Sequence, residues 1–178
     1  VRHRMPGVVN PPVEHLKRAV AAGFLGNQTL VEAYMETHAK FAQRPALMGP
    51  EGDFTHAQLD DITNRVAAAF MDLGLKPLDR VVFQVPNCNE LIFGWLGCLK
   101  AGLIPICSLV SHREREIGYL ANHGEARLHF VQGDDPKFDH VEFVERIQAQ
   151  ATTIKHIVVA RGPARGKALS TKALYDAQ

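Results

Sequence analysis

The chain has 178 residues, of which 46% are hydrophobic and 22% charged, so it can bury a substantial core and is neither disordered nor fibrous. Its 20 lysines and arginines nearly balance its 19 aspartates and glutamates, which gives a net charge of +1. Nucleic acid and anionic membrane surfaces are therefore disfavoured as partners, because no strong positive field gathers phosphate groups. No apolar stretch reaches the roughly 20 residues that span a bilayer, so no integral membrane segment is expected.

The two ends of the chain suggest a piece of a longer protein, and the cysteines suggest a reducing compartment. The sequence starts at Val1 without the apolar core of a signal peptide, and Gln178 directly follows an apolar periodic segment, so we expect a piece of a longer protein. Cys88, Cys98 and Cys107 lie in apolar runs and are expected to be reduced thiols packed as small hydrophobic side chains. A cytoplasmic location follows as the expectation. Near a predicted helix start, Cys88 is interpreted as a buried or capping thiol.

Two helices are predicted before residue 45. Residues 13–22 form a short amphipathic stretch that ends at a glycine, after a proline-interrupted start that is expected to be irregular. Thr29 and Glu32 have the spacing of a capping box, in which each side chain satisfies a backbone N–H of the first turn. Apolar residues then recur at helical spacing, which predicts a helix to about Ala42.

A hairpin and a longer helix are predicted next. Residues 46–48 and 54–55 are typical of two short strands, and the glycines between them suit a turn. Thr55 and Gln58 have the spacing of a second capping box. The helix that follows is expected to end at Gly74 as its left-handed cap.

From residue 80 onward, short apolar strands alternate with helices. Strands are predicted at residues 80–85, 103–107, 126–132 and 154–160, with helices at 91–101, after 111, and at 138–150. Asn87 with Glu90, and Ser111 with Glu114, are predicted to cap two of these helices. Since such crossovers favour parallel pairing, the fold class is α/β: a doubly wound, mostly parallel sheet with flanking helices and a small N-terminal hairpin.

The helix at residues 91–101 is apolar nearly all round, which predicts burial on more than one side. Gly94 and Gly97 are expected to let neighbouring elements approach closely.

Sequence motifs for phosphate and metal binding are weak. No Gly-x-Gly-x-x-Gly occurs, and residues 162–167 only superficially resemble a phosphate loop, because the spacing is one residue short and Ala168 replaces a metal-binding hydroxyl. A surface loop is predicted there. The histidines and cysteines lack metal-ligand spacing, so no metal site is expected.

Ser111, His112 and Arg113 form the most interesting polar cluster. They precede a helix at the carboxyl end of a predicted strand, where backbone N–H groups and the helix dipole favour an anion. Capping by Ser111, with His112 and Arg113 in solvent, is the simpler interpretation. Both interpretations remain open from the residues alone.

Three blocks together resemble the start of an adenylate-forming (AMP-binding) enzyme of the acyl- or aryl-acid CoA ligase type. Residues 54–59 (Phe-Thr-His-Ala-Gln-Leu) are similar to the family's aromatic-Thr-Tyr-x-Glu-Leu motif. Residues 79–90 resemble its Asp-Arg-Val strand followed by Pro-Asn-Ser-x-Glu, and residues 99–106 its Leu-Lys-Ala-Gly-x-x-x-x-Pro signature. The departures are His56 for Tyr, Gln58 for Glu and Cys88 for Ser.

The resemblance spans residues 30–159 and implies a domain organisation. Residues 1–28 are expected to be an N-terminal extension, residues 29–160 the N-terminal α/β subdomain of an AMP-binding domain, and residues 161–178 a loop and the start of the next element. The full-length enzyme is expected to use ATP, Mg2+ and coenzyme A to activate a carboxylic acid through an acyl-adenylate. The family's phosphate loop and catalytic lysine are absent from the 178 residues, so this piece is expected to be inert, to bind no cofactor and to hold no catalytic residue.

The resemblance also implies binding residues. In some members the loop after the Lys-Ala-Gly strand touches the coenzyme A nucleotide, which corresponds here to Ser108, Leu109 and Val110. The Ser-His-Arg run at residues 111–113, followed by Glu-Ile at 116–117, resembles the dihydroxybenzoate-type aryl-acid ligases and makes Ser111, His112 and Arg113 substrate-binding candidates.

Several functions stay open at this point. The acid can be fatty, aryl or alicyclic, and the acyl acceptor can be coenzyme A or a carrier protein. The expected partners are a small carboxylic acid, the remaining catalytic and C-terminal domains of the same chain, and a second copy if uncovered apolar surface self-associates. The alternative is a self-contained α/β binding or interaction module without catalysis.

Overall fold

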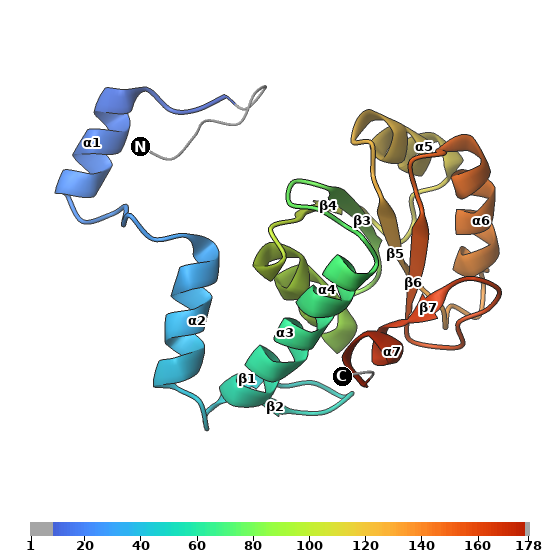
Figure 1. Cartoon of the computed structure of the whole chain (residues 1–178), viewed down its shortest axis with the longest axis horizontal. Coiled ribbons are helices and arrows are strands. Elements are labelled where there is room, and N and C mark those ends of the chain that lie inside the picture. The colour runs from blue at the N-terminus through green and yellow to red at the C-terminus, as the bar shows by residue number, and fades with distance from the viewer. Residues whose placement is uncertain (1–8, 177–178) are drawn as a thin grey trace.

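The computed structural model describes residues 9–176 (Figure 1). Its N-terminal part holds α1 (Val13–Ala21), α2 (Leu30–Lys40), the antiparallel strands β1 (Pro45–Leu47) and β2 (Phe54–Thr55), and α3 (His56–Asp72). The predicted helices and hairpin are confirmed, with ends shifted by one or two residues. Part of the proline-interrupted start, residues 1–8, lies outside the described residues.

The rest of the chain forms a five-stranded sheet whose strands all run parallel, in the order β4-β3-β5-β6-β7. Its strands are β3 (Arg80–Gln84), β4 (Ile104–Cys107), β5 (Leu128–Gln132), β6 (His156–Ala160) and β7 (Leu169–Ser170). The helices are α4 (Asn89–Lys100), α5 (Glu114–His123), α6 (His140–Gln150) and α7 (Thr171–Asp176). The four predicted strands are confirmed, and β7 and α7 lie where the start of a further element was expected. The domain boundaries stay a prediction.

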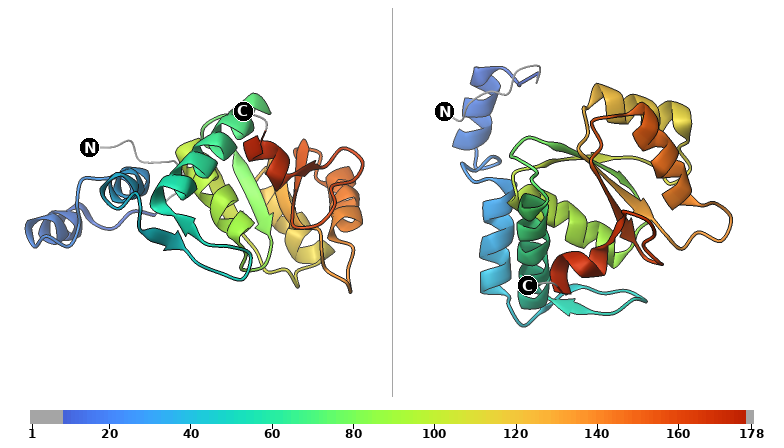
Figure 2. Two further views of the ribbon diagram at one scale, coloured as in Figure 1. Left: turned by 90° about the horizontal axis from the view of Figure 1, so that it is seen from below. Right: turned by 45° about the vertical axis from the view of Figure 1, so that its right-hand side comes forward.

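Both faces of the sheet are covered by helices, as a doubly wound fold requires (Figure 2). Successive strand residues point to opposite faces, so each face buries its own core. Val81 and Phe83 of β3 pack in the core that includes residues of α3, α4 and α7, whereas Val82 packs in the core that includes α5 and α6. The predicted fold class is therefore confirmed.

Two of the four predicted helix caps are correct. The amide of Glu32 donates to Thr29 Oγ1 at 3.2 Å, and the amide of Gln58 donates to Thr55 Oγ1 at 3.2 Å; each partner side chain accepts from the cap residue's own amide in return. These two boxes start α2 and α3.

The other two caps are wrong. Helix α4 starts after Cys88, which makes no side-chain capping bond, so Asn87 is not its cap. Helix α5 starts after Arg113, whose amide donates to Glu116 Oε2 at 3.1 Å, so the cap lies two residues beyond Ser111. The reason is a turn closed by the His112 amide and the Leu109 carbonyl, which holds Ser111 outside the helix.

Helix α4 is clamped between α3 and the sheet, and its two glycines make this possible. A Cβ added at Gly94 would lie 2.9 Å from ring atoms of both Phe83 and Phe130. A Cβ added at Gly97 would lie 2.5 Å from Val66 Cγ1 of α3. The predicted close approach at both glycines is confirmed.

Strand β4 is an edge of the sheet and departs from expectation at one residue. Cys88 and Cys98 are buried as predicted, but Cys107 is exposed at the end of this edge strand, so the prediction of a packed thiol is wrong there.

The backbone of β4 leaves one position without a donor on the open side of the sheet. The Ser108 amide donates to the Phe83 carbonyl of β3, and the Ile104 amide donates to the carbonyl of Asp79, the residue before β3. Because backbone amides along a strand point alternately to its two sides, the nitrogen of Pro105 points away from β3, to the side of β4 that has no neighbouring strand. Proline has no N–H to donate there.

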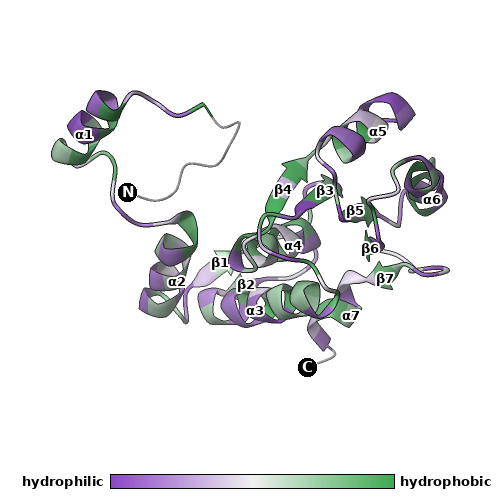
Figure 3. Ribbon diagram, turned by 45° about the horizontal axis from the view of Figure 1, so that its top comes forward, coloured by the Kyte–Doolittle hydropathy of each residue, from purple (hydrophilic) through white to green (hydrophobic). Residues whose placement is uncertain are grey.

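The N-terminal helix α1 stands apart from the sheet, and none of its residues is buried (Figure 1). Coloured by hydropathy, it shows both hydrophobic and hydrophilic residues on its surface (Figure 3). No helix within residues 9–176 combines the length and the apolar character that crossing a bilayer demands.

Candidate functional site

The carboxyl ends of the parallel strands meet along one edge of the sheet, and the loops that leave them form the candidate site. We call this region the carboxyl edge; it comprises residues 85–88, 108–113, 133–139 and 161–168. All six binding residues predicted from the sequence lie in its second loop, between β4 and α5.

The loop at residues 108–113 is held by hydrogen bonds to strand β3. Ser108 donates twice to the Phe83 carbonyl, from its amide at 2.9 Å and from Oγ at 3.0 Å. Gln84, which is fully buried, donates from Nε2 to the carbonyls of Val110 at 3.3 Å and His112 at 2.9 Å. The course of the loop is therefore fixed by a buried amide side chain in the neighbouring strand.

Arg113 also stabilises this loop. Its Nη1 donates to the carbonyls of Val110 and His112, both at 2.8 Å, and its guanidinium lies 3.8 Å from the centre of the Phe138 ring. Leu109, in contrast, is 64% exposed. The cation of Arg113 thus holds loop carbonyls and an aromatic face, and its substrate-binding role stays a prediction, as do the roles of the other five residues.

A second network joins the hairpin to the carboxyl edge. Arg161 donates from Nη1 to Glu51 Oε1 at 2.9 Å and from Nε to Asp134 Oδ2 at 2.8 Å. Glu51 also accepts from the Asn89 amide at 3.4 Å, at the start of α4. The loop at residues 161–168 was predicted as a surface loop, and its first arginine ties together segments 110 positions apart in the sequence.

The same loop borders a polar cavity of about 330 Å³ beside α6, lined by Gly133, Asp135, Pro136, Lys137, Phe138, Asp139 and Arg165. Arg165 Nη2 lies 2.5 Å and 2.6 Å from the two carboxylate oxygens of Asp139. This contact, and then the Glu142 amide, lower the pKa of Asp139. Strand β7 follows the loop instead of a helix, so the structure agrees with the rejection of a phosphate loop at residues 162–167.

Cys88, at the start of α4, is not an activated nucleophile. Burial is the main reason that its pKa rises to about 11, and the charge of Glu90 adds to the effect. The thiol is therefore protonated at neutral pH, as the interpretation of a buried or capping thiol predicts.

Gln84 and Arg161 are the site residues that sequence reasoning missed. Gln84 had one visible signal, because it is a polar residue within an otherwise apolar buried strand. A buried amide needs hydrogen-bond partners, and the partners here are two carbonyls of the loop that follows the neighbouring strand. Arg161 gave no comparable local signal.

We expect Gln84→Leu to loosen residues 108–113 while leaving the sheet folded. Two hydrogen bonds are lost, each worth about 1 kcal/mol, so amide hydrogen exchange in this loop should accelerate by about tenfold or more. Gln132→Leu is the matched control, because Gln132 ends the neighbouring strand and donates to Asp134 instead. Unchanged exchange at 108–113 in Gln84→Leu, or equal acceleration in both variants, would contradict the anchoring role.

Comparisons with known proteins agree on one family. Residues 35–178 match the family model described as AMP-binding enzyme. The chain is 30% identical over 138 residues to a 2,3-dihydroxybenzoate-AMP ligase of Bacillus subtilis (strain 168), which covers 78% of this chain and 26% of the relative. It is 28% identical over 170 residues to a 2-hydroxy-7-methoxy-5-methyl-1-naphthoate–CoA ligase of Streptomyces carzinostaticus, covering 96% of this chain and 30% of the relative.

A solved structure gives the same result. The apo structure of Mycobacterium smegmatis MbtA superimposes with a TM-score of 0.86 and 27% identity, covering 96% of this chain and 31% of that one. The chain thus spans less than a third of the length of these relatives. With the family model matching residues 35–178, the chain belongs to the AMP-binding enzymes.

Proposed function

We propose that this chain is the N-terminal part of an enzyme that activates a carboxylic acid with ATP. The carboxylate oxygen attacks the α-phosphorus, the bond to the bridging oxygen of pyrophosphate breaks, and an acyl-adenylate forms. A thiol then displaces AMP. The match of residues 35–178 to the AMP-binding enzymes carries this proposal, together with the three motif blocks at residues 54–59, 79–90 and 99–106.

The described residues contribute a scaffold and one wall of the site in this proposal. The hydroxyl of Ser108 and Nη1 of Arg113 already donate to backbone carbonyls within the protein. A coenzyme A nucleotide at residues 108–110 would therefore be contacted by exposed Leu109, by backbone atoms and by the acceptor side of the serine oxygen. The groups that hold ATP and Mg2+ would come from later segments of the longer protein.

We further propose an aromatic acid with a hydroxyl group beside the carboxylate. The two relatives named above are named for 2,3-dihydroxybenzoate and for a 2-hydroxy-1-naphthoate, and both acids carry that ortho hydroxyl. The Ser-His-Arg run at residues 111–113 supports the same branch. Fatty acids are the less favoured substrates in this proposal.

The test is ATP–pyrophosphate exchange by a longer protein that continues past residue 178. We expect ortho-hydroxybenzoates to support exchange with a kcat/KM at least about tenfold above benzoate and further above medium-chain fatty acids, because a site built to bind a hydroxyl strongly rejects analogues that lack it. Exchange with fatty acids alone would overturn the choice of acid. Absence of exchange over a broad panel of acids would overturn adenylation itself.

The acyl acceptor needs its own measurement, since one relative is named as an AMP ligase and the other as a CoA ligase. We propose coenzyme A, on the strength of the predicted contact at residues 108–110. Formation of an acyl-CoA by the longer protein is the expected result, and transfer only to a carrier-protein thiol would overturn it. Calorimetry of the 178-residue chain with ATP and coenzyme A should show no tight binding; tight binding would favour the self-contained binding module.

A further inference from the structure

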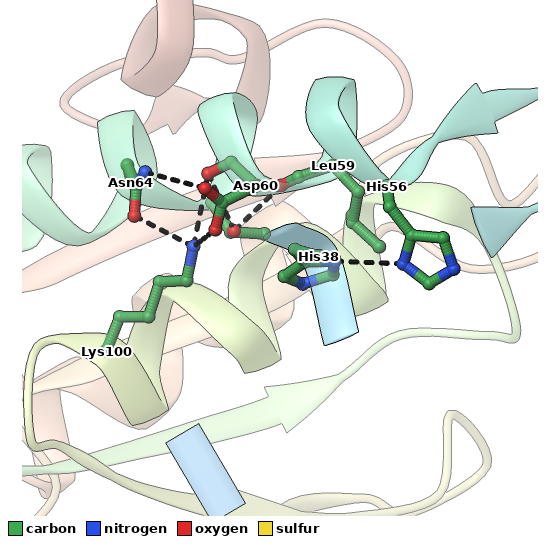
Figure 4. Close-up of polar contacts among 7 residues, drawn as sticks. His38, His56, Leu59, Asp60, Asn64 and Lys100 are labelled. Atoms are coloured by element: carbon green, nitrogen blue, oxygen red, sulfur yellow. Dashed lines mark hydrogen bonds and ion pairs between the residues drawn. The ribbon is translucent and has the colours of Figure 1, made fainter. Parts of the chain in front are cut away.

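Two histidines from different elements face one another where α2 packs on α3 (Figure 4). His38 lies in α2 and His56 is the first residue of α3, and their Nδ1 atoms are 3.0 Å apart. His56 is also one of the positions where the sequence departs from the pattern it resembles, which has tyrosine there.

The short distance between the two Nδ1 atoms allows only one hydrogen between them. At 3.0 Å, one Nδ1 must donate its hydrogen and the other must accept with its lone pair. When both rings are protonated, both Nδ1 atoms carry a hydrogen, so the bond is lost and two cations face each other. The contact is therefore available only while at least one ring is neutral.

This contact is central to how α2 is held. Within α2, whose residues are all described, His38 is the one buried side chain, at 3% exposure. Its ring stacks at 6.0 Å on Tyr34 of the same helix, and its Nε2 is buried without a hydrogen-bond partner among the described residues. A charge on His38 would thus be poorly solvated in the packed state.

The charged groups that face the pair do little to stabilise such a charge. Asp60 of α3 is the nearby carboxylate, but its Oδ1 already lies 2.6 Å from Lys100 Nζ of α4. On the side of His56, the Phe41 ring lies 6.3 Å away, with Lys40 and Arg44 over that ring.

The pKa of His38 follows from these surroundings. Burial lowers it below 6.5; Asp60 partly opposes the shift, and Lys100 and His56 lower the pKa further.

We propose that the His38–His56 pair is an acid-sensitive contact that holds α2 against α3 at neutral pH and releases it on mild acidification. The sign follows from linkage. Because the undocked state binds a proton with the ordinary affinity of histidine and the docked state binds it less tightly, the docking free energy is fully present above pH 6.5. It is lost as the pH falls from 6.5 through the pKa of docked His38. For each unit by which docking lowers that pKa, the docking equilibrium constant falls by a factor of about ten.

Hydrogen exchange on the 178-residue chain at pH 7.5 and pH 5.0, corrected for the intrinsic pH dependence of exchange, tests this proposal. We expect protection of the α2 amides to fall between the two pH values relative to the amides of α4, a helix without a histidine. His38→Asn places an amide group near the position of Nδ1 and removes the buried ring that titrates, so it should retain most of the α2 protection at pH 5.0. His123→Asn, at an exposed histidine of α5, is the matched control and should respond like the unchanged chain.

A second measurement keeps the test decisive if His38→Asn perturbs packing at pH 7.5. In the unchanged chain, NMR titration of the imidazole rings should place the midpoint of His38 below 6.5, with the α2 amide shifts moving at that same midpoint. A midpoint at or above 6.5 would overturn the proposal. So would equal pH responses of α2 and α4, or an undiminished α2 response in His38→Asn with packing intact.

Discussion

Gly97→Ala should lower the free energy of unfolding by about 1 kcal/mol, although alanine is the better helix former. In an exposed helix this change stabilises by about 1 kcal/mol. Here the new Cβ would lie 2.5 Å from Val66 Cγ1 and 3.0 Å from Val66 Cβ, in a fully buried contact between α4 and α3. Overpacking of a core costs about 1–3 kcal/mol, and Val66 is fully buried.

Gly118→Ala is the matched control for this prediction. Gly118 also lies inside a helix, α5, but an added Cβ meets no atom within 4 Å. This variant should therefore gain stability by up to about 1 kcal/mol. Urea unfolding of the two variants beside the unchanged chain measures the difference. If both glycines gave stabilisation when replaced, the close packing of α4 against α3 would be refuted.

His129 should make the whole fold sensitive to acid. This histidine of β5 is fully buried, and neither ring nitrogen has a hydrogen-bond partner among the described residues. Its neighbours across the sheet are Val82 and Ile157, both buried. Burial, with a smaller contribution from nearby His140, lowers the pKa of His129 from 6.5 to about 3.

The sign of the effect follows from proton binding. Between pH 6.5 and the folded pKa, the unfolded chain takes up a proton at His129 that the folded chain does not, so stability falls as the pH is lowered. At 1.36 kcal/mol per pH unit, the loss from this one residue is roughly 3 kcal/mol between pH 6.5 and pH 4. Above pH 6.5 the contribution is constant.

His129→Leu is the variant that isolates this term. It removes the titrating ring and two unpaired buried nitrogens while keeping similar volume, so stability at pH 7 should be maintained or increased. Urea midpoints measured from pH 7 to pH 4 should fall less in this variant than in the unchanged chain. His123→Leu, at an exposed position, should leave the pH profile unaltered. Parallel profiles for His129→Leu and the unchanged chain would contradict the prediction.

The fold was largely predictable because its signals are local. The Thr29 and Thr55 boxes each depend on residues three positions apart, and both are correct. The start of α5 was misplaced because the turn closed by Leu109 and His112 decides where this helix begins, and residue preferences at Ser111 do not report that turn. The exposure of Cys107 depends on strand order, which an apolar run does not reveal.

The candidate site was predictable in position but not in its contacts. Strand–helix alternation places residues 108–113 at the carboxyl edge, and the structure agrees. The salt bridge from Arg161 to Glu51 joins residues 110 positions apart, and the Gln84 bonds reach residues 26 and 28 positions ahead. Such pairings are set by the packing of distant elements, so the residue types alone could not identify them.

The proline in strand β4 has a consequence for how copies of this protein meet. An exposed strand invites a neighbouring molecule to continue the ladder, which is a common start of fibril growth. At Pro105 the outward-facing N–H is missing, so a strand that paired with β4 would have one backbone carbonyl without a hydrogen-bond donor. Sheet-to-sheet polymerisation is therefore discouraged on this flank, and substitution of Pro105 by valine would remove that protection.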